Sequence, residues 1–222
     1  MESHIVRIES IGKISHDVLR IVTHKPCGYF FKPGQATEVS INKGHWRKEK
    51  RAFTFTGLPD DPFLEFTIKT YPSHKGVTNQ LLSLIPGDEL ILQDAWGAIS
   101  YQGEGVFIAG GAGITPFLSI FRQLAADNSI NNNRLIFANK TKADIIHEQE
   151  LKKLLGSAVH YILSEEIVPG FEHGFITKDF LKKNLPASPI KIYVCGPPPM
   201  LDSVLQNLSN LGVGDDALVA EL

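Results

Sequence analysis

Cysteine is scarce in this chain: its 222 residues include only 2, Cys27 and Cys195. Two thiols cannot build the disulfide framework of a small secreted protein, and they are too few for the thiolate ligands of an iron–sulfur cluster. Any electron chemistry therefore needs an organic cofactor. The 8 histidines are scattered without a close pair at metal-ligand spacing, so we predict no metal site.

Long apolar runs and an excess of one charge are also missing. No run approaches the roughly 20 residues that cross a bilayer, and the start, Met1-Glu2-Ser3-His4, lacks the basic-then-apolar order of a secretory signal. Lysine and arginine total 22 against 24 acidic residues, a formal net charge of −2, which gives no overall attraction to nucleic acid. We expect a cytoplasmic protein with no membrane span and no nucleic-acid partner.

The N-terminal part of the chain reads as short strands separated by turn residues. Residues 63–69, Phe-Leu-Glu-Phe-Thr-Ile-Lys, alternate in polarity as expected for an antiparallel strand with one buried face. We predict a small closed barrel, interrupted by one helix from about Val77 to Leu84 that Pro86-Gly87 ends. The predicted strands are Ile5 to Ser10, Val18 to Thr23, Ala36 to Ile41, Ala52 to Thr56, Leu64 to Thr70 and Glu89 to Leu92.

After Tyr101 the pattern changes to strands that alternate with helices, which predicts a parallel sheet with crossover helices. We therefore divide the chain into a barrel domain, residues 1–101, and an α/β domain, residues 102–222. The predicted strands of the second domain are Val106 to Ala109, Leu135 to Ala138, Val159 to Leu163, Lys191 to Cys195 and Ala217 to Ala220; the predicted helices are Pro116 to Ala126, Glu148 to Leu155, Lys178 to Asn184 and Met200 to Leu211.

A glycine-rich turn joins the first of these strands to the helix that follows. Gly110, Gly111 and Gly113 let the backbone approach a ligand closely, Thr115 suits a helix cap, and Pro116 suits the first helical turn. Free N–H groups and the positive end of the helix would then face an anion such as a dinucleotide pyrophosphate. Taken alone, the turn also suits a tight crossover with no ligand.

A second candidate, Arg51-Ala52-Phe53-Thr54, lies in a predicted strand of the barrel. Arg51 and Phe53 would share one face while Thr54 points to the other, unless the strand bends. A guanidinium pairs with a diphosphate, an aromatic ring stacks on a flat heterocycle, and a hydroxyl bonds a ring nitrogen. The alternative is an edge strand with a solvated arginine and a core phenylalanine.

Two turns of the barrel are further candidates. Lys75-Gly76-Val77-Thr78 opens a helix, and its free N–H groups would form a second anion site; an ordinary capped helix is the alternative. Residues 31–35, Phe-Lys-Pro-Gly-Gln, form a Pro-Gly turn entering a strand, which a hairpin alone would explain.

Residues 195–200, Cys-Gly-Pro-Pro-Pro-Met, follow the fourth predicted strand of the α/β domain. They lie at its carboxyl end, the edge at which open α/β sheets bind ligands. The prolines fix the backbone as the chain turns into a helix, and Cys195 would face the same crevice as the glycine turn. Nothing cationic adjoins Cys195 in sequence to activate its thiol, so we expect a positional role for it rather than reactivity.

The five motifs, in this order, resemble the sequence signature of the ferredoxin–NADP reductase superfamily. That signature reads Phe-x-Pro-Gly-Gln, Arg-x-aromatic-Ser/Thr, Gly-x-Ser/Thr, Gly-Gly-x-Gly-x-Thr-Pro and Cys-Gly-Pro-Pro-x-Met, matched here by residues 31–35, 51–54, 76–78, 110–116 and 195–200. The resemblance covers nearly the whole chain. It implies a flavin-binding β-barrel followed by a Rossmann-like, nicotinamide-binding α/β domain, with flavin and nicotinamide meeting in the cleft between them.

The resemblance also implies roles for single residues. Arg51 would bind the flavin pyrophosphate, Phe53 would pack against the flavin, and Thr54 would contact the ring near N5. FAD is favoured, although FMN stays an alternative because we identify no residue that reads the adenine. Lys75, Gly76, Val77 and Thr78 would hold the flavin diphosphate; Gly110, Gly111, Gly113, Thr115, Pro116, Asn139, Asp144, Cys195, Gly196, Pro197 and Met200 would contact the nicotinamide dinucleotide; and Thr54, Cys195 and Glu221 would serve the chemistry.

Two positions depart from the family's pattern. Phe53 stands where tyrosine is common, which removes a hydroxyl contact and keeps the stacking face. Many members end in an acidic residue shortly before a terminal aromatic that covers the flavin; Glu221 matches the acid, but Leu222 follows it. The resemblance therefore does not carry over the aromatic shield or the proton route.

The choice between NADH and NADPH falls in residues 139–144, after the second strand of the α/β domain. An acidic side chain accepts a hydrogen bond from a free ribose 2′-hydroxyl, whereas basic side chains favour a 2′-phosphate. Residues 135–146 are similar to the NADH-using cytochrome and nitrate reductases of the family, with Asp144 at their acidic position. Lys140 and Lys142 favour NADPH. We expect NADH.

These features predict an FAD-dependent reductase that passes a hydride from NADH or NADPH to the flavin and electrons to a separate ferredoxin, flavodoxin or haem protein. The basic loop Lys43–Arg51 would steer an acidic carrier, or would be merely solvated surface. Two alternatives stay open: a free-flavin or ferric-complex reductase, and a non-catalytic redox-sensing subunit that binds nucleotide.

Overall fold

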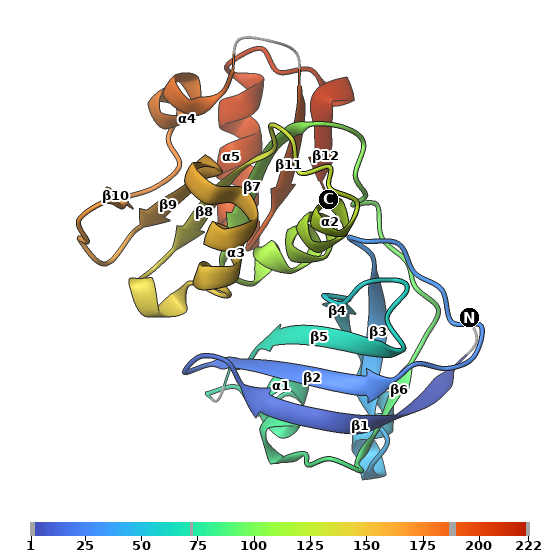
Figure 1. Cartoon of the computed structure of the whole chain (residues 1–222). Helices are drawn as coiled ribbons and strands as arrows, with labels where there is room; N and C mark the ends of the chain where they lie inside the picture. The colour runs from blue at the N-terminus through green and yellow to red at the C-terminus, as the bar shows by residue number, and fades with distance from the viewer. Residues whose placement is uncertain (1–2, 72, 187–189, 221–222) are drawn as a thin grey trace.

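The computed structural model describes residues 3–71, 73–186 and 190–220. The chain forms two domains, each built around one six-stranded sheet (Figure 1). Strands β1 to β6 make the first sheet and strands β7 to β12 make the second. The predicted architecture, an antiparallel barrel followed by a parallel α/β sheet, is confirmed.

The first sheet is antiparallel and curls into a nearly closed barrel. Its strand order is β4-β3-β6-β1-β2-β5, and a bridge between Phe55 and Phe66 links the two edges. The inward side chains of all six strands fill one apolar core, because a barrel of this size has no room for more than side chains. The strands are β1 His4–Lys13, β2 Val18–His24, β3 Ala36–Ile41, β4 Arg51–Thr54, β5 Phe63–Lys69 and β6 Glu89–Leu92.

A short helical segment lies between β5 and β6. The predicted helix from Val77 to Leu84 is divided in the structure: α1 spans Val77–Gln80 and continues as a 3₁₀ turn, η2, over Leu81–Ser83. Val77 and Leu81 are buried in the barrel core. Since so short a helix is unstable alone, this packing is what holds it.

The second sheet is parallel throughout, with strand order β10-β9-β8-β7-β11-β12. Its strands are β7 Gly105–Gly110, β8 Arg134–Asn139, β9 Val159–Leu163, β10 Glu172–His173, β11 Lys191–Cys195 and β12 Leu218–Ala220, and its helices are α2 Thr115–Ala126, α3 Glu148–Leu155, α4 Lys178–Asn184 and α5 Pro198–Ser209. The sequence did not predict the short edge strand β10.

Helices cover both faces of this sheet (Figure 1). Helices α2 and α3 pack on one face around Phe107 and Phe121, and α4 and α5 pack on the other around Val194 and Val204. Every residue of the central strand β7 is buried, as expected for a parallel strand covered on both faces. The carboxyl ends of β7, β8 and β11 meet at one edge of the sheet, where the glycine turn and residues 195–200 follow them.

Strand β5 is buried on both of its faces. Leu64, Phe66 and Ile68 pack into the barrel core, as the alternation predicts. Glu65 and Thr67, on the opposite face, are only 4% and 5% exposed. The prediction of one buried face is therefore wrong for this strand, because its polar face lies against the second domain (Figure 1).

The segment between the two sheets packs on the second domain. Ile99 is buried in the apolar cluster beneath α2, and the ring of Tyr101 stacks on Tyr193 with 6.3 Å between ring centroids. The Tyr193 hydroxyl donates to the carbonyl of Gly103 at 2.7 Å. These contacts tie the connection to the α/β domain from Ile99 onward.

The basic loop between β3 and β4 contains a 3₁₀ turn, η1, over Gly44–Lys48, which the sequence did not predict. Lys43, Arg47 and Lys48 are exposed there. Across the described ranges, each helix is too short or too polar to cross a lipid bilayer.

Candidate functional site

The glycine turn after β7 lies directly against the segment that follows β11. A Cβ atom on Gly113 would collide with the carbonyl of Cys195, and one on Gly110 would collide with Pro197 and Met200. The Cys195 backbone leaves room only for glycine at Gly113, whereas a side chain at Gly110 would displace Met200. At Gly111, φ is +50°, and an added Cβ would meet nothing within 4 Å. The turn is therefore packed on one side and open on the other, where a ligand can approach its backbone.

The predicted helix cap at Thr115 is wrong. A 3₁₀ turn, η3, spans Gly111–Ile114 and runs directly into α2, so Thr115 is the first residue of α2 and Ile114 precedes it in helical conformation. The Thr115 hydroxyl donates backward to the carbonyl of Ala112 at 3.0 Å. Pro116 lies in the first turn of α2, as predicted. The helical N–H groups available to an anion therefore begin one turn earlier than expected.

Residues 195–200 keep their predicted place at the sheet edge. Cys195 is half-buried and pairs in register with Ala109, next to the glycine turn. Helix α5 starts at Pro198 rather than at Met200. The Met200 side chain fills the space between Gly110 and Gly196, which gives Met200 a packing contact rather than an open position.

Asn139, the last residue of β8, carries a buried amide with no protein partner. The residue is 7% exposed, and within the described part of the chain neither its Oδ1 nor its Nδ2 makes a hydrogen bond. Leaving such a group unpaired costs about 1–3 kcal/mol, so the position calls for a bound molecule or water. Its neighbour Ala138 pairs with Gly110 of the glycine turn, which places Asn139 at the same sheet edge.

Asp144 is engaged within the protein. Its Oδ2 accepts from the amide and the hydroxyl of Thr141 at 3.0 and 2.7 Å, closing a capping box over the 3₁₀ turn η4, Lys142–Asp144. Its Oδ1 lies 3.4 Å from Lys69 Nζ and 3.6 Å from His16 Nε2. Burial opposes ionisation, but the bonds from Thr141 and the ion pair with Lys69 lower the pKa of Asp144. Both carboxylate oxygens of Asp144 therefore already have partners within the protein.

Arg51, Phe53 and Thr54 lie on the edge strand β4. The register with β3 runs without a bulge, so Arg51 and Phe53 share one side of the strand, as predicted. Arg51 is exposed, and its Nη1 donates to the carbonyl of Lys50 at 2.6 Å. Phe53 and Thr54 are half-buried, so all three keep surface that a ligand can cover. Glu221 lies outside the described residues.

The turn before α1 is open. Gly76 is the residue that precedes the helix, and an added Cβ there would meet nothing within 4 Å. Lys75 is exposed and Thr78 is half-buried, whereas Val77 is buried in the barrel core and offers a ligand only its backbone. Because α1 has 4 residues, an anion here would depend on individual N–H groups and on Lys75 more than on a helix dipole.

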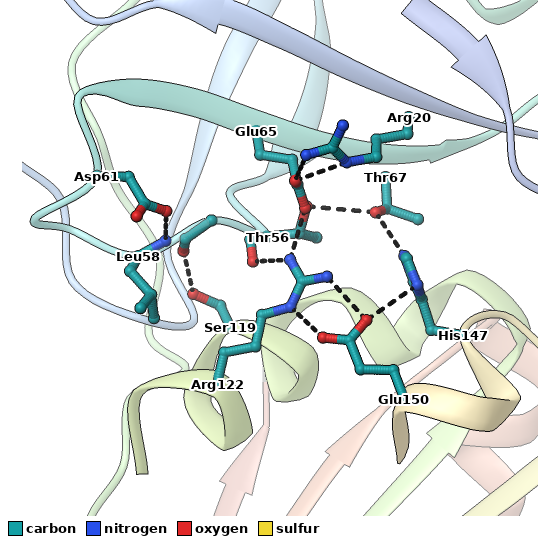
Figure 2. Close-up of polar contacts among 11 residues, drawn as sticks. Arg20, Thr56, Leu58, Asp61, Glu65, Thr67, Ser119, Arg122, His147 and Glu150 are labelled. Carbon is teal, nitrogen blue, oxygen red and sulfur yellow. Dashed lines mark hydrogen bonds and ion pairs between the residues drawn. The ribbon is translucent and has the colours of Figure 1, made fainter. Parts of the chain in front are cut away.

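A polar cluster between the two domains was missed by the sequence analysis (Figure 2). Glu65 of β5 accepts from Arg20 Nε of β2 at 2.7 Å and from Arg122 Nη1 of α2 at 2.5 Å. Arg122 also donates to both carboxylate oxygens of Glu150, at 2.6 and 2.9 Å, and His147 Nδ1 lies 3.1 Å from Glu150. The one signal in the sequence was the polar half of the β5 alternation.

Charge pairing outweighs burial in this cluster. Burial opposes ionisation of Glu65, but Arg122 and Arg20 lower its pKa. Burial likewise opposes ionisation of Glu150, but hydrogen bonds from His147 and Arg122 lower its pKa to about 2. Burial works against the charge of Arg122 too, and the two carboxylates raise its pKa. At neutral pH Glu65, Glu150 and Arg122 are therefore ionised, and Glu65 and Arg122 pair across the domain boundary.

A second ion cluster lies beside it. His16, Asp17 and Asp144 each bring one potential ligand atom to within 4.8 Å of the others. The Lys69 ammonium lies 3.0 Å from Asp17 and 3.4 Å from Asp144, so a cation already compensates both carboxylates. We assign these residues to the domain contact.

Known proteins resemble this chain along nearly its whole length. The family model described as "Oxidoreductase NAD-binding domain" matches residues 107–206. The reductase component of propane 2-monooxygenase from Rhodococcus jostii is 29% identical and covers 98% of this chain, which spans 62% of that protein's length. An NADH-cytochrome b5 reductase 1 from Pyricularia oryzae is 32% identical and covers 90% of this chain, which spans 71% of its length.

A solved structure shares the fold. The ferredoxin NADP⁺ reductase from Neisseria gonorrhoeae, solved with bound FAD and NADP, matches with a TM-score of 0.86 at 19% identity, over 100% of this chain and 98% of that one. The barrel, the parallel sheet and their order along the chain agree with that architecture. The fold and the relationship to the cytochrome b5 reductases together show that this chain belongs to the ferredoxin–NADP reductase superfamily of NAD-binding oxidoreductases.

Proposed function

We propose that this protein is an FAD-dependent NADH reductase that delivers electrons to a separate acceptor. The observation that carries the proposal is the edge of the second sheet, where the unpaired, buried Asn139 amide adjoins a turn that accepts only glycine at Gly113. Open α/β sheets bind ligands at this edge. We take residues 1–101 as the flavin domain and residues 102–222 as the nicotinamide domain.

The barrel residues fit a flavin dinucleotide. The exposed guanidinium of Arg51 would pair with the pyrophosphate, the half-buried ring of Phe53 would pack against the flavin, and the hydroxyl of Thr54, the last residue of β4, would bond the ring near N5. The open backbone at Gly76 and the exposed Lys75 would bind the second phosphate. The diphosphate of FAD would bind both the Arg51 guanidinium and the turn at Lys75 and Gly76. The single phosphate of FMN would bind only one of them, which favours FAD.

The sheet edge fits a nicotinamide dinucleotide. The backbone at Gly111 and the N–H groups of η3 would hold its pyrophosphate, the Asn139 amide would gain a partner, and Cys195 with Gly196 would lie beside the nicotinamide. With both cofactors held there, a bound nicotinamide would supply hydride chemistry and a bound flavin would relay the electrons to the acceptor. The chain's own residues bind and orient; the cofactors carry the chemistry.

NADH is favoured as the donor by two carboxylates, Glu165 and Glu166, near the adenosine end. Lys140 Nζ forms an ion pair with Glu165 at 2.8 Å, and the amide of Lys142 donates to Glu166 at 2.7 Å. Carboxylates in this position repel a ribose 2′-phosphate and can accept from a free 2′-hydroxyl. Discrimination would thus lie with Glu165 and Glu166 instead of Asp144. The relatives named NADH-cytochrome b5 reductase agree with this choice.

An acidic protein is the acceptor that best fits the barrel surface. The exposed Lys43, Arg47 and Lys48 lie in the loop that leads into β4, which carries the proposed flavin contacts. Such a patch accelerates association with an acidic partner in a salt-dependent way. Lys48→Glu should lower kcat/KM for an acidic carrier by about fivefold with ferricyanide turnover unchanged, while Lys183→Glu on α4 should change neither. If kcat/KM for the acidic carrier changes neither with salt nor with Lys48→Glu, the proposed docking surface is wrong.

The proposed function is tested by visible spectroscopy. Purified protein, reconstituted with FAD, should be yellow with the absorption of an oxidised flavin, and anaerobic NADH should bleach it in one equivalent. NADPH titrated in parallel should act more weakly. A protein that takes up neither FAD nor FMN would overturn the proposal.

Two other functions give different results in the same preparation. A free-flavin or ferric-complex reductase would turn over with added flavin or ferric chelates and show no preference for a protein carrier. A redox-sensing subunit would bind flavin tightly and turn over slowly with every acceptor.

A further inference from the structure

A row of three polar side chains on β5 reaches from the barrel into the second domain. Glu65, Thr67 and Lys69 alternate with the core residues of the strand and so lie on one face. Each one contacts a different residue of the second domain: Glu65 pairs with Arg122 at 2.5 Å, Thr67 Oγ1 lies 3.3 Å from His147 Nε2, and Lys69 Nζ lies 3.4 Å from Asp144.

The barrel fixes both ends of this row. Arg20 on the neighbouring strand β2 lies 2.5 Å from Glu65 through Nη2, and Asp17 lies 3.0 Å from Lys69. Glu65 and Lys69 of β5 are therefore held by residues of their own domain as well as by residues of the second domain. Held in this way, they have little freedom to follow a displaced partner.

The second domain is equally constrained on its side. Arg122 divides its donors between Glu65, both oxygens of Glu150 and the backbone carbonyl of Thr56, to which Nη1 donates at 2.6 Å (Figure 2). His147 adopts φ of +55°, a left-handed conformation that is uncommon outside glycine, and its ring lies between Thr67 and Glu150. Backbone strain of this kind persists where surrounding contacts determine the position.

We propose that this row is a positioning device, in which Glu65 and Arg122 hold the barrel and the α/β domain at the one separation suited to hydride transfer. The inference rests on the proposed function, since it concerns the alignment of the two proposed cofactor sites. An apolar interface alone would let the domains slide. Arg122 is held by its forked contact with Glu150, and from that position its Nη1 donates to Glu65 and to the Thr56 carbonyl of the barrel, which fits one geometry. Hydride transfer is steeply sensitive to such alignment, because a displacement of about 1 Å can cost roughly a hundredfold in rate.

The kinetic test uses Arg122→Lys, which keeps the charge and loses the fork, and Glu65→Gln. At saturating NADH the rate of flavin reduction in stopped flow should fall about tenfold in each variant. Flavin content and the KM for NADH should stay within about twofold, since neither residue belongs to a proposed cofactor site. The matched control is Lys152→Gln, which removes an ion pair within α3 and should leave the rate unchanged. Wild-type reduction rates in both interdomain variants would overturn the proposal.

An orientation measurement separates this inference from the proposed function. Residual dipolar couplings of backbone amides should fit one alignment tensor for both domains of the wild-type protein, with or without flavin, and should require two tensors in Glu65→Gln. If that variant does not fold, Arg122→Lys and Thr67→Val provide the same comparison. A single tensor in the folded variants overturns the positioning role. If the protein binds no flavin, the proposed function is overturned. The residual dipolar couplings still test whether the row of Glu65, Thr67 and Lys69 fixes the orientation of the two domains.

Discussion

Glu65 and Arg122 are separated by 57 positions in the sequence and by 2.5 Å between Oε1 and Nη1. One residue belongs to an antiparallel barrel strand and the other to the first helix of a parallel α/β domain. Because Glu65 and Arg122 pair with each other, the polar face of β5 and that of α2 are buried only when the two domains are in contact. The domain boundary is therefore part of the core of this protein, and changes there should affect stability and alignment together.

Removing one partner of this pair should be costly. Glu65→Leu leaves the half-buried Arg122 and Arg20 without the carboxylate that they share, and we expect a loss of about 3 kcal/mol in the free energy of unfolding, measured by urea denaturation. Glu38→Gln, which breaks the exposed ion pair with Lys50, should cost less than about 1 kcal/mol. Equal losses in the two variants would contradict a buried, mutually dependent pair.

Acid should weaken the domain contact over a defined range. The pKa of Glu150 is lowered from 4.5 to about 2, and the pKa values of Glu65 and Asp144 are lowered as well. A carboxylate with a lowered folded-state pKa stabilises the protein above its unfolded-state value and loses that contribution as the pH falls through the folded-state pKa. The free energy of unfolding should therefore fall between about pH 5 and pH 2, with Glu150 contributing on the order of 1–2 kcal/mol after solvent screening.

The variant Glu150→Gln isolates this contribution. It should flatten the decrease in stability over that pH range in urea titrations, whereas Glu172→Gln, at an exposed edge-strand position, should leave the slope as it is. An unchanged slope in Glu150→Gln would mean that Glu150 does not contribute to the acid response.

Replacing Asn139 by leucine should weaken NADH binding without lowering the stability of the protein. Because the side chain is buried without a protein partner, Asn139→Leu should leave the unliganded protein equally stable or stabilise it by about 1 kcal/mol, and should weaken NADH binding by about tenfold. Chemical denaturation and calorimetry measure the two effects. In the matched variant Asn133→Leu the lost amide bonds to Gly105 and Ile130, so stability should fall.

A substitution at Gly76 should weaken flavin binding without affecting folding. A Cβ atom there enters open space, so Gly76→Ala should fold with wild-type stability and weaken flavin affinity by about tenfold, because the methyl group occupies the approach to the N–H groups. Gly12→Ala also places a methyl group in open space, on β1, and should alter neither property. Flavin fluorescence quenching reports the affinity, and equal affinities in the two variants would remove Gly76 from the flavin site.

The donor preference should follow Glu165. Replacing it by glutamine releases the exposed Lys140 from its ion pair, so Glu165→Gln should raise the ratio of NADPH to NADH kcat/KM by about fivefold. Steady-state rates with both donors measure this. Lys152→Gln, which breaks a comparable surface pair on α3, should leave the ratio at its wild-type value.

Local chemistry determined much of this protein before any contact was known. The period-2 alternation of residues 63–69, the alternation of strands and helices after residue 101, and the Gly110–Gly113 turn are properties of neighbouring residues. The sequence therefore predicted two domains of the observed kinds, with a glycine-rich turn between the first strand and the first helix of the second domain. The order of five motifs also predicted the family to which the chain belongs.

Tertiary structure decided the rest, because it depends on which distant groups meet. The polar face of β5 became a buried interface only when Arg122 of α2 and His147 covered it, and the same packing brought Lys69 to Asp144. Thr115 lost its predicted cap to a 3₁₀ turn, and Asn139 was buried without a partner at the end of β8. Partner choice among charged and polar side chains follows from three-dimensional proximity and exclusion of water, which no local pattern encodes.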